Sequence, residues 1–262
     1  MTFKNRNSFA ITKSVLFALL LREMRSRFGA KRFGMFWILF EPTIQIVLLI
    51  VIFTLRGRTV ANVDFPAYLV TGMIPFFLMR NMMLKGMEAV SANKALFSYK
   101  QIKPFDTVLA RCLMEIMLYA CVYIIFMVVM AFWFDINIFM VDPLRWATVL
   151  IVGLVFAFSL ALLFCMLAEA LPESKSIIRL LFFPLYLLSG VLFPIWLLPN
   201  EIISLLLWNP FVHIIDELRA ATFQHYALHS GINLLYPLKL SIFLLFIALG
   251  LYRLRRFRLV AI

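Results

Sequence analysis

Residues 22–42 read REMRSRFGAKRFGMFWILFEP, a basic segment followed at once by an apolar one. Five Lys and Arg side chains lie in this stretch and none lies beyond Arg32, while 34–55 is nearly all apolar with Glu41 as its only charge. A cluster of cations beside a long apolar run is typical of the cytoplasmic edge of a membrane span. This junction therefore predicts a membrane protein whose first span begins near Gly34.

The composition of the whole chain agrees with a membrane location. Of its 262 residues, 64% are hydrophobic and 15% are charged, whereas a soluble domain is about half apolar and about a quarter charged. The net charge of +12 would suit a nucleic-acid partner if the basic residues formed one soluble face, but here they border the apolar runs. We therefore expect an all-α integral membrane protein with no nucleic-acid partner.

Candidate spans are recognised by length, because a hydrocarbon core of about 30 Å needs roughly 20 helical residues. Three runs of at least 19 residues carry no charge, and three further runs each hold one charged residue, Glu41, Arg80 or Lys239. The six spans that this pattern predicts are 34–55, 67–84, 112–134, 146–168, 180–198 and 232–252.

The distribution of basic residues orients these spans. Nineteen of the 25 Lys and Arg residues lie in the N-terminal segment, in the second and fourth connections and in the C-terminal RLRRFR. Arg56, Arg58, Arg145 and Arg219 lie on the opposite side. Since Lys and Arg accumulate in cytoplasmic loops, both termini are expected in the cytoplasm.

Residues 8–29 are predicted to form a helix ahead of the first span. Leu16, Leu20, Met24 and Phe28 recur at every fourth position, and basic residues cover the other faces. A basic amphipathic helix of this kind lies in the headgroup layer. It either anchors the chain alone or also contacts a cytoplasmic partner.

The pair Glu41-Pro42 is predicted to start a new helical segment within or just below the membrane. Proline suits the first turn of a helix but not its interior, and a carboxylate at that position is favoured by the helix dipole. Glu41 is expected to face protein or water, because a charge in hydrocarbon is costly.

Two connections are predicted to contain short helices. Residues 88–103 are too polar to span, and a surface helix is expected to end before Pro104, because the residue before a proline disfavours helical conformation. This helix either caps the bundle or transmits a movement of a partner protein to the bundle. Residues 199–231 hold two amphipathic pieces that flank the tripeptide WNP, and neither piece is long enough to cross.

Residues 199–231 are therefore expected to turn back on the extracytoplasmic side as re-entrant or interfacial helices. Irregular backbone at membrane depth must be buried in protein or line a wet cavity. His213, Asp216 and Glu217 fit one turn of the second piece, and their polar face is expected to meet water.

No catalytic or metal-binding motif emerges from the chain. Gly29 and Gly34 have the spacing of a phosphate-binding loop, but the Lys and Ser or Thr that must follow are missing. His225 and His229 are four residues apart without the glutamate of a zinc hydrolase between them. No metal, cofactor or enzymatic activity is expected in this chain.

Five segments together resemble one known family, the inner-membrane permeases of bacterial ABC polysaccharide exporters. This is the ABC-2 type, and the similarity is to its capsular polysaccharide branch over nearly the whole chain. The segments are LLLREMRSRFGAKRFGMFWILFEP (19–42), YLVTGMIPFFLMRN (68–81), ANKALFSYKQIKPFDTVLAR (92–111), LLSGVLFPIWLLP (187–199) and WNPFVHIIDELRAATF (208–223).

This resemblance implies that the chain is half of a transporter. Two copies would form a twelve-span channel, and two copies of a separate ATPase, which holds ATP and magnesium, would bind from the cytoplasm. A periplasmic polysaccharide co-polymerase and an outer-membrane export protein are implied as further partners. The residues implied for ATPase coupling lie on two helices: Arg22, Glu23, Arg25 and Arg27 on the interface helix 8–29, and Asn93, Lys94 and Tyr99 on the coupling helix 88–103. The residues implied for an extracytoplasmic gate are Trp208, His213, Asp216, Glu217 and Arg219.

The chemistry of a sugar polymer suggests residues that could line a channel. Aromatic faces suit sugar C–H groups, and fixed cations suit acidic sugars. The candidates are Trp37, Phe40, Glu41, Phe76 and Arg80. Taken with these candidates, the resemblance implies an exporter of lipid-linked, acidic capsular polysaccharide in the bacterial inner membrane.

Other functions stay open on the sequence alone. An ABC-2 permease could instead carry O-antigen, teichoic acid or a drug. A membrane enzyme that acts on lipid-linked sugars is a further alternative. A secondary transporter would need a coupling-ion carboxylate at the membrane midplane, and Glu115, the one plausible candidate, is expected near the cytoplasmic end.

Overall fold

The computed structural model describes residues 8–28, 34–55, 63–99, 101–136 and 138–260. All regular elements in this part of the chain are helical. They are α1 (Ser8–Phe28), α2 (Gly34–Leu55), α3 (Phe65–Met87), η1 (Ser91–Ser98), α4 (Pro104–Trp133), α5 (Pro143–Ala170), α6 (Ser174–Leu187), η2 (Ile195–Leu197), α7 (Asn200–Leu206), α8 (Pro210–Thr222) and α9 (Leu235–Val260).

Proline and short polar residues determine where several helices begin. Pro104, Pro143 and Pro210 are the first residues of α4, α5 and α8, where the N–H that proline lacks would have no partner within the helix. Asp142 and Asn209 precede two of these prolines, and their side chains accept backbone N–H groups of the first turn. These starts follow from the local sequence.

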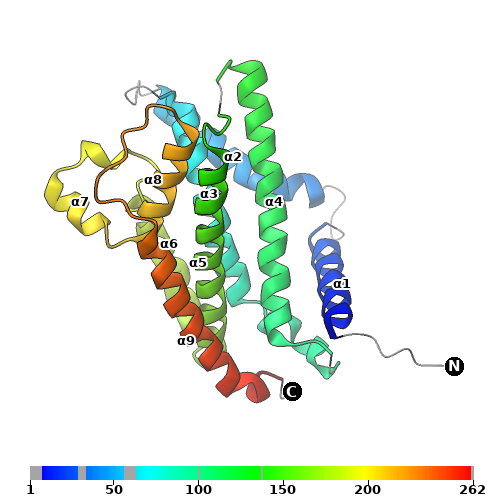
Figure 1. The fold of residues 1–262 in the computed structure, drawn as a ribbon. Helices are drawn as coiled ribbons and strands as arrows, with labels where there is room; N and C mark the ends of the chain where they lie inside the picture. The colour runs from blue at the N-terminus through cyan, green and yellow to red at the C-terminus, as the bar shows by residue number, and fades with distance from the viewer. Residues whose placement is uncertain (1–7, 29–33, 56–62, 100, 137, 261–262) are drawn as a thin grey trace.

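The long helices run along the length of the molecule, α4 in the direction opposite to α3, α5 and α9 (Figure 1). α3 leads to the end at which α1 begins, α4 returns, α5 runs back, and α9 reaches that same end again. We call this the inner end, drawn at the bottom of Figure 1, and the opposite one, near α7, the outer end. The chain therefore begins α1 and finishes α9 on the same side of the bundle.

α3 and α5 form the centre of the bundle. Every residue of α3 from 67 to 79 is buried. α5 packs along α3 and α9, while α3 also contacts α4 and α8. α2 and α6 pack less closely and leave large apolar side chains exposed. The central helices thus position the site, and α2 and α6 form its outer wall.

Four helices in the described part of the chain are long and apolar enough to cross a membrane. They are Phe65–Met87, Pro104–Trp133, Pro143–Ala170 and Leu235–Arg256. These helices contain all or most of four of the six predicted spans. The predicted spans 34–55 and 180–198 fall on α2 and α6, which differ from the expectation.

α2 is one helix through Pro42, so the prediction that a new segment starts at Glu41-Pro42 is wrong. Pro42 lies inside the helix, where it removes one backbone hydrogen bond. In an apolar surrounding, interrupting the helix would leave several more backbone groups unpaired, so continuing it costs less. The side chains of Trp37 and Glu41 lie outside the described residues.

α6 ends at Leu187, so residues 180–198 do not form the single helix that was expected. Gly190 has φ +66°, a left-handed conformation that glycine adopts easily and that ends a helix. Residues 188–194 are irregular, and the short 3-10 helix η2 follows. The chain can break here because Arg219 binds the carbonyl oxygens of Gly190 and Val191, at 2.7 and 2.8 Å.

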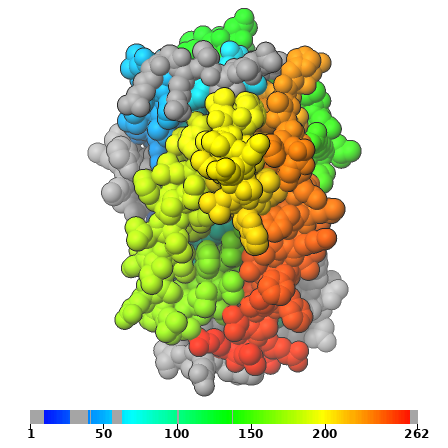
Figure 2. Space-filling view, turned by 90° about the vertical axis from the view of Figure 1, so that its left-hand side faces the viewer, coloured from blue at the N-terminus to red at the C-terminus, as the bar shows by residue number. Residues whose placement is uncertain are grey.

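The helices after this break lie over the outer ends of their neighbours. Figure 2 shows α7 in yellow across the outer part of the face that α6 and α9 form. α8 packs inward against α3 and α5. The predicted pieces 201–208 and 211–223 correspond closely to α7 and α8, which are too short to span.

Arg219 clamps α8 to the rest of the fold. Its guanidinium is fully buried, donates hydrogen bonds to the hydroxyl (2.7 Å) and carbonyl (3.2 Å) oxygens of Tyr68, and lies 3.5 Å from the centre of the Tyr68 ring. Gly72, one turn further along α3, gives it room, because a Cβ there would lie 2.2 Å from Nη2 of Arg219. One side chain thus joins α3, α8 and the turn after α6.

We expect Gly72→Ala to destabilise the subunit by about 1–3 kcal/mol, because the added methyl group displaces the Arg219 guanidinium from its acceptors. The unfolding temperature of the detergent-purified protein should fall by roughly 2–10 °C. The matched control is Gly250→Ala on α9, where a Cβ meets no atom within 4 Å. Equal unfolding temperatures of the two variants would contradict the clamp.

Candidate functional site

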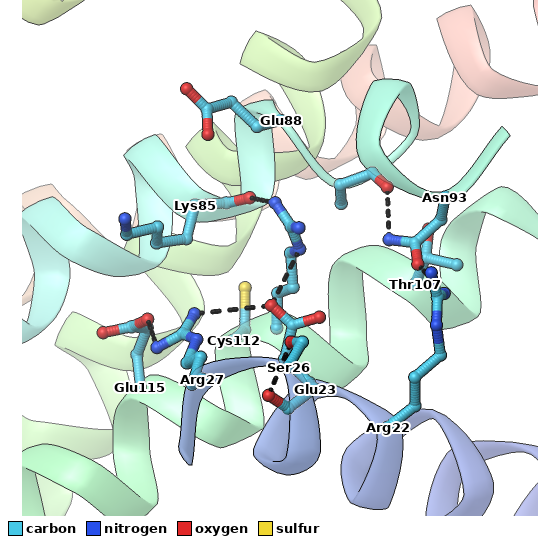
Figure 3. Close-up of polar contacts among 12 residues, drawn as sticks. Arg22, Glu23, Ser26, Arg27, Lys85, Glu88, Asn93, Thr107, Cys112 and Glu115 are labelled. Carbon is cyan, nitrogen blue, oxygen red and sulfur yellow. Dashed lines mark hydrogen bonds and ion pairs between the residues drawn. The ribbon is translucent and has the colours of Figure 1, made fainter. Parts of the chain in front are cut away.

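Two ion pairs at the inner end hold α1 against α4. Oε1 of Glu23 lies 3.2 Å from Nε of Arg111, and Nη1 of Arg27 lies 2.6 Å from Oε1 of Glu115 (Figure 3). On both helices the second partner follows the first by four residues, so α1 and α4 run side by side in the same direction. α1 therefore packs against the first part of α4, and its location in the headgroup layer stays a prediction.

The carboxylate of Glu115 is occupied by its ion pair with Arg27. Its side chain is 2% exposed and its ion-pair partner Arg27 is 17% exposed. A carboxylate buried to this degree requires such a partner. The carboxylate that the sequence offered for a coupling ion therefore anchors α1 instead.

α1 is also joined to η1. Arg22 donates a hydrogen bond to the side-chain oxygen of Asn93, whose amide nitrogen donates to the carbonyl oxygen of Ala89 at 2.7 Å (Figure 3). Asn93 is buried. Three segments far apart in the sequence, α1, η1 and α4, thus form one polar cluster at the inner end.

The remaining predicted coupling residues lie at the surface of this cluster. Arg25 is exposed, and so is Tyr99, by 65%. Lys94 has a side chain that is 65% exposed and lies 3.6 Å from Glu169. Tyr99 also lines a groove of about 490 Å³, the α1–η1 groove. This groove is lined mainly by apolar residues, among them Ile11, Val15, Leu19, Leu96 and Ile102.

A second cavity, of about 590 Å³, opens between α1, α2, α3, α4 and α6 near the inner end. We call it the inner cavity. Two ion pairs lie in its wall, Arg27 with Glu115 and Arg179 with Glu88. In the part of the chain that the structure describes, the charged side chains that line it are Arg27, Arg80, Lys85, Glu88, Glu115 and Arg179.

Among its described residues, the inner cavity carries a surplus of positive charge. Its two carboxylates are both occupied by arginines, so Arg80 and Lys85 are left without an acidic partner among the described residues. Asn81 lies between them on α3 and donates a hydrogen bond to the hydroxyl of Tyr119 at 2.7 Å. An anion is the ligand that such a cavity favours.

The predicted channel residues do not all gather here. Arg80 lines the inner cavity. Phe76 is fully buried and packs against Phe77, Tyr186 and Phe211 with ring centres 5.2–6.0 Å apart, so it offers no surface to a passing polymer in this structure. Phe40 is half-buried and is not among the cavity residues.

Sequence reasoning overlooked most of the polar wall of the inner cavity. Asn81, Lys85 and Glu88 follow one another at intervals of four and three residues, which places them on one face of α3. This periodicity was visible, but Lys85 and Glu88 were assigned to the following loop. Arg179 could not be found in this way, because it pairs with Glu88 across 91 positions of sequence.

On α8, the polar face that was expected to meet water is buried. His213 and Asp216 are 3% and 2% exposed. Tyr226 donates a hydrogen bond to Asp216, and burial raises the pKa of Asp216 to about 6. The prediction is wrong because α8 packs against α3 and α5, and neighbouring loops supply the polar partners.

The other predicted gate residues have different environments. His213 accepts the backbone N–H of Asn233 at Nδ1 (3.0 Å), so its Nε2 carries the proton and donates to the carbonyl oxygen of Leu207 (2.8 Å). Glu217 accepts two hydrogen bonds from Arg145, at 2.7 and 3.1 Å. Trp208 is 78% exposed. These side chains fix the outer helices in place, and Trp208 alone among the five offers a large free surface.

Comparison with known proteins places this geometry in a family. Residues 14–223 match the family model described as ABC-2 type transporter. The chain is similar to the polysialic acid transport protein KpsM of Escherichia coli, with 35% identity over 95% of this chain and 96% of that protein. It is also similar to two proteins named capsule polysaccharide export inner-membrane protein.

These two are BexB of Haemophilus influenzae and CtrC of Neisseria meningitidis serogroup A. BexB is 28% identical over 85% of this chain and 83% of its own length. CtrC is 29% identical over 82% of each chain. The family match covers most of α1 and all of α2 to α8, which include the inner cavity and the Arg219 clamp, and it ends before α9. The chain belongs to the ABC-2 type transporter family.

Proposed function

We propose that this chain is the membrane subunit of an ATP-driven exporter that carries lipid-linked, acidic capsular polysaccharide across the bacterial inner membrane. The observation that carries the proposal is the similarity, over 95% of the chain, to a protein named for the transport of polysialic acid. Polysialic acid has a carboxylate on each sugar, and the inner cavity has a surplus of cations among its described residues. The chain is a transport subunit, and ATP is hydrolysed on a separate one.

α4 supports a particular depth in the membrane. It has 30 residues, or about 45 Å of helix. Its charges, Asp106, Arg111 and Glu115, are confined to the first twelve residues. The uncharged remainder measures about 27 Å, close to the hydrocarbon thickness of about 30 Å. The inner end, which is rich in Lys and Arg, is then cytoplasmic, and it contains the start of α1 and the end of α9.

Six crossings follow if α2 and the α6 region are added to the four long apolar helices. α6 alone has 14 residues, and the irregular residues 188–198 complete the pass. Irregular backbone at this depth is tolerated when protein groups satisfy it. The bonds from Arg219 to Gly190 and Val191 meet that requirement.

A second copy of the chain would close the inner cavity. α2 and α6 form one side of it, and their outer surfaces expose Leu48, Val51, Leu180 and Phe183. Lipid suits these apolar side chains but not the adjoining cations, because an unpaired charge in hydrocarbon is costly. Two copies that meet along α2 and α6 would enclose both cavities in one twelve-span conduit.

The inner end supplies a docking surface for two copies of an ATPase that hold ATP and magnesium. α1 and η1 form the α1–η1 groove, which Tyr99 lines, and Arg25 of α1 and Lys94 of η1 are also exposed. A periplasmic polysaccharide co-polymerase and an outer-membrane export protein complete the proposed route. These outer partners rest on the family resemblance alone.

The direct test of the function is deletion of the gene in a capsulated host. Polymer should accumulate inside the cell, because synthesis continues without export, and surface polymer should fall to background. Extraction of surface and intracellular polymer measures both. A plasmid copy should restore export, and normal surface polymer in the deletion strain would reject the proposal.

Changes at η1 should uncouple the ATPase. We expect Lys94→Ala with Tyr99→Ala to reduce transport-linked ATP turnover by about tenfold, because an interface of this kind depends on a few anchoring side chains. The matched control is Lys239→Ala, an exposed lysine in the outer half of α9. Wild-type turnover in the double variant of the purified complex would place docking elsewhere.

Cysteine labelling checks the proposed orientation. In a Cys121→Ser background, which removes the one exposed cysteine among three, Ser230→Cys and Ser98→Cys place single thiols at exposed sites. A membrane-impermeant maleimide should label the first in intact spheroplasts and the second only after lysis. The reverse pattern would invert the topology.

A further inference from the structure

Asp216 is a buried carboxylate whose hydrogen bonds are incomplete. It lies on α8 and is 2% exposed. Its Oδ1 accepts a hydrogen bond from the hydroxyl of Tyr226, whereas its Oδ2 is buried without a hydrogen-bond partner among the described residues. An ionised carboxylate needs several donors to replace the water that it loses on burial. One donor therefore leaves the charged form of Asp216 poorly compensated.

Arg219 lies three residues further along α8 but does not complete the site. Its charge favours the ionised form of Asp216, yet its four hydrogen bonds go to Tyr68, Gly190 and Val191. Its third guanidinium nitrogen, Nε, is buried without a partner in the described part of the chain. Burial outweighs the attraction between the two charges, and it raises the pKa of Asp216 to about 6.

The other titratable and charged groups near this part of α8 have partners of their own. Arg145 of α5 is bound to Glu217, and both ring nitrogens of His213 are bound to backbone groups. Among the residues that the structure describes, Tyr226 is therefore the one hydrogen-bond donor to Asp216. The full set is His213, Glu217 and Arg219 on α8, Tyr68 on α3, Arg145 on α5, Tyr236 on α9, and Tyr226 and His229 in the loop 223–234.

The loop 223–234 brings this site close to water at the outer end. Tyr226 is half-buried, and its ring packs edge-on against Trp196 with ring centres 4.9 Å apart. Residues 224, 225 and 227 beside it are exposed. His229, half-buried in the same loop, acts on Asp216 through its charge. A proton can thus reach Asp216 through a small movement of one loop, while the packed helices stay in place.

We propose that Asp216 is a proton-binding site on the outer side of the membrane and that the bound proton stabilises the clamped arrangement of α8. The proton comes from the outer water and binds to Oδ2, while Oδ1 keeps the hydrogen bond from Tyr226. When α8 moves away from α3, water reaches the carboxylate and the proton leaves. Because the clamped arrangement binds the proton more tightly, acid on the outer side favours that arrangement.

The first test measures the stability of the full-length, detergent-purified chain against pH. Folded Asp216 keeps its proton up to about pH 6, whereas an exposed aspartate loses it near pH 4. Stability should therefore rise as the pH falls from about 7.5 to about 5, and the unfolding temperature should rise by about 2–5 °C more in the wild type than in Asp216→Asn. The matched control is Glu201→Gln, which removes an exposed carboxylate of α7 and should respond as the wild type does.

Two further measurements distinguish proton binding from a purely structural role of Asp216. Tyr226→Phe removes the donor that favours the ionised form, so the midpoint of the pH response should move to higher pH. Infrared spectra should show the carbonyl band of a protonated carboxyl group at about pH 5 in the wild type but not in Asp216→Asn. An equal pH response of the wild type and Asp216→Asn, or spectra that do not differ in this band, would overturn the proposal.

The consequence for export rests on the proposed function and is tested separately. Inside-out vesicles from the capsulated host have the outer side in their lumen, and the pH of the lumen is set when they are made. With the ATPase side held at neutral pH, ATP-dependent entry of polymer should be on the order of threefold slower at a lumen pH of about 5 than at about 7.5. In Asp216→Asn it should be nearly independent of the lumen pH.

The two possible failures of the vesicle test differ. The same slowing in the wild type and in Asp216→Asn would reject control of transport by this proton. No entry of polymer into wild-type vesicles at either pH would reject the proposed function instead, and the stability and infrared measurements would still decide whether Asp216 binds the proton.

Discussion

One buried guanidinium determines the arrangement of the outer half of the protein. Arg219 makes four hydrogen bonds without any exposed surface, and a buried charge persists only where such partners exist. The chain break after α6 supplies two of the acceptors, the carbonyl oxygens of Gly190 and Val191. The break would leave these groups unpaired without the arginine, and the arginine would lack acceptors without the break. Each therefore requires the other.

Charge pairing also organises the inner half, but there some cations have no acidic partner among the described residues. Arg27 binds Glu115 and thereby both sets the register of α1 on α4 and lines the inner cavity. Arg22 binds Asn93, so the same helix is attached to η1. α1 thus contacts η1 and lines the inner cavity through residues that are five positions apart. A displacement of η1 would reach the cavity through these contacts.

The candidate site was partly accessible from sequence. Arg80 was recognised because a cation inside an apolar run must avoid lipid, where an unpaired charge has a high free-energy cost. The stripe of Asn81, Lys85 and Glu88 has helical spacing but crosses the boundary at which the predicted span ended. The ion-pair partner of Glu88 is Arg179, which lies in another helix. The spacing of neighbouring residues in the sequence cannot predict such a pair. Which cations remain unpaired is therefore a property of the assembled bundle.

The sequence by itself determined the helical membrane class, the long apolar helices and their proline-initiated starts, because these depend on local hydropathy and backbone chemistry. Tertiary structure alone decided that α2 continues through Pro42, that α6 ends at Leu187 and that α8 turns its polar face inward. Each of these outcomes depends on whether distant groups satisfy buried backbone and charged atoms. Such partners, as between Tyr68 and Arg219, lie up to 151 residues apart and become neighbours only on folding.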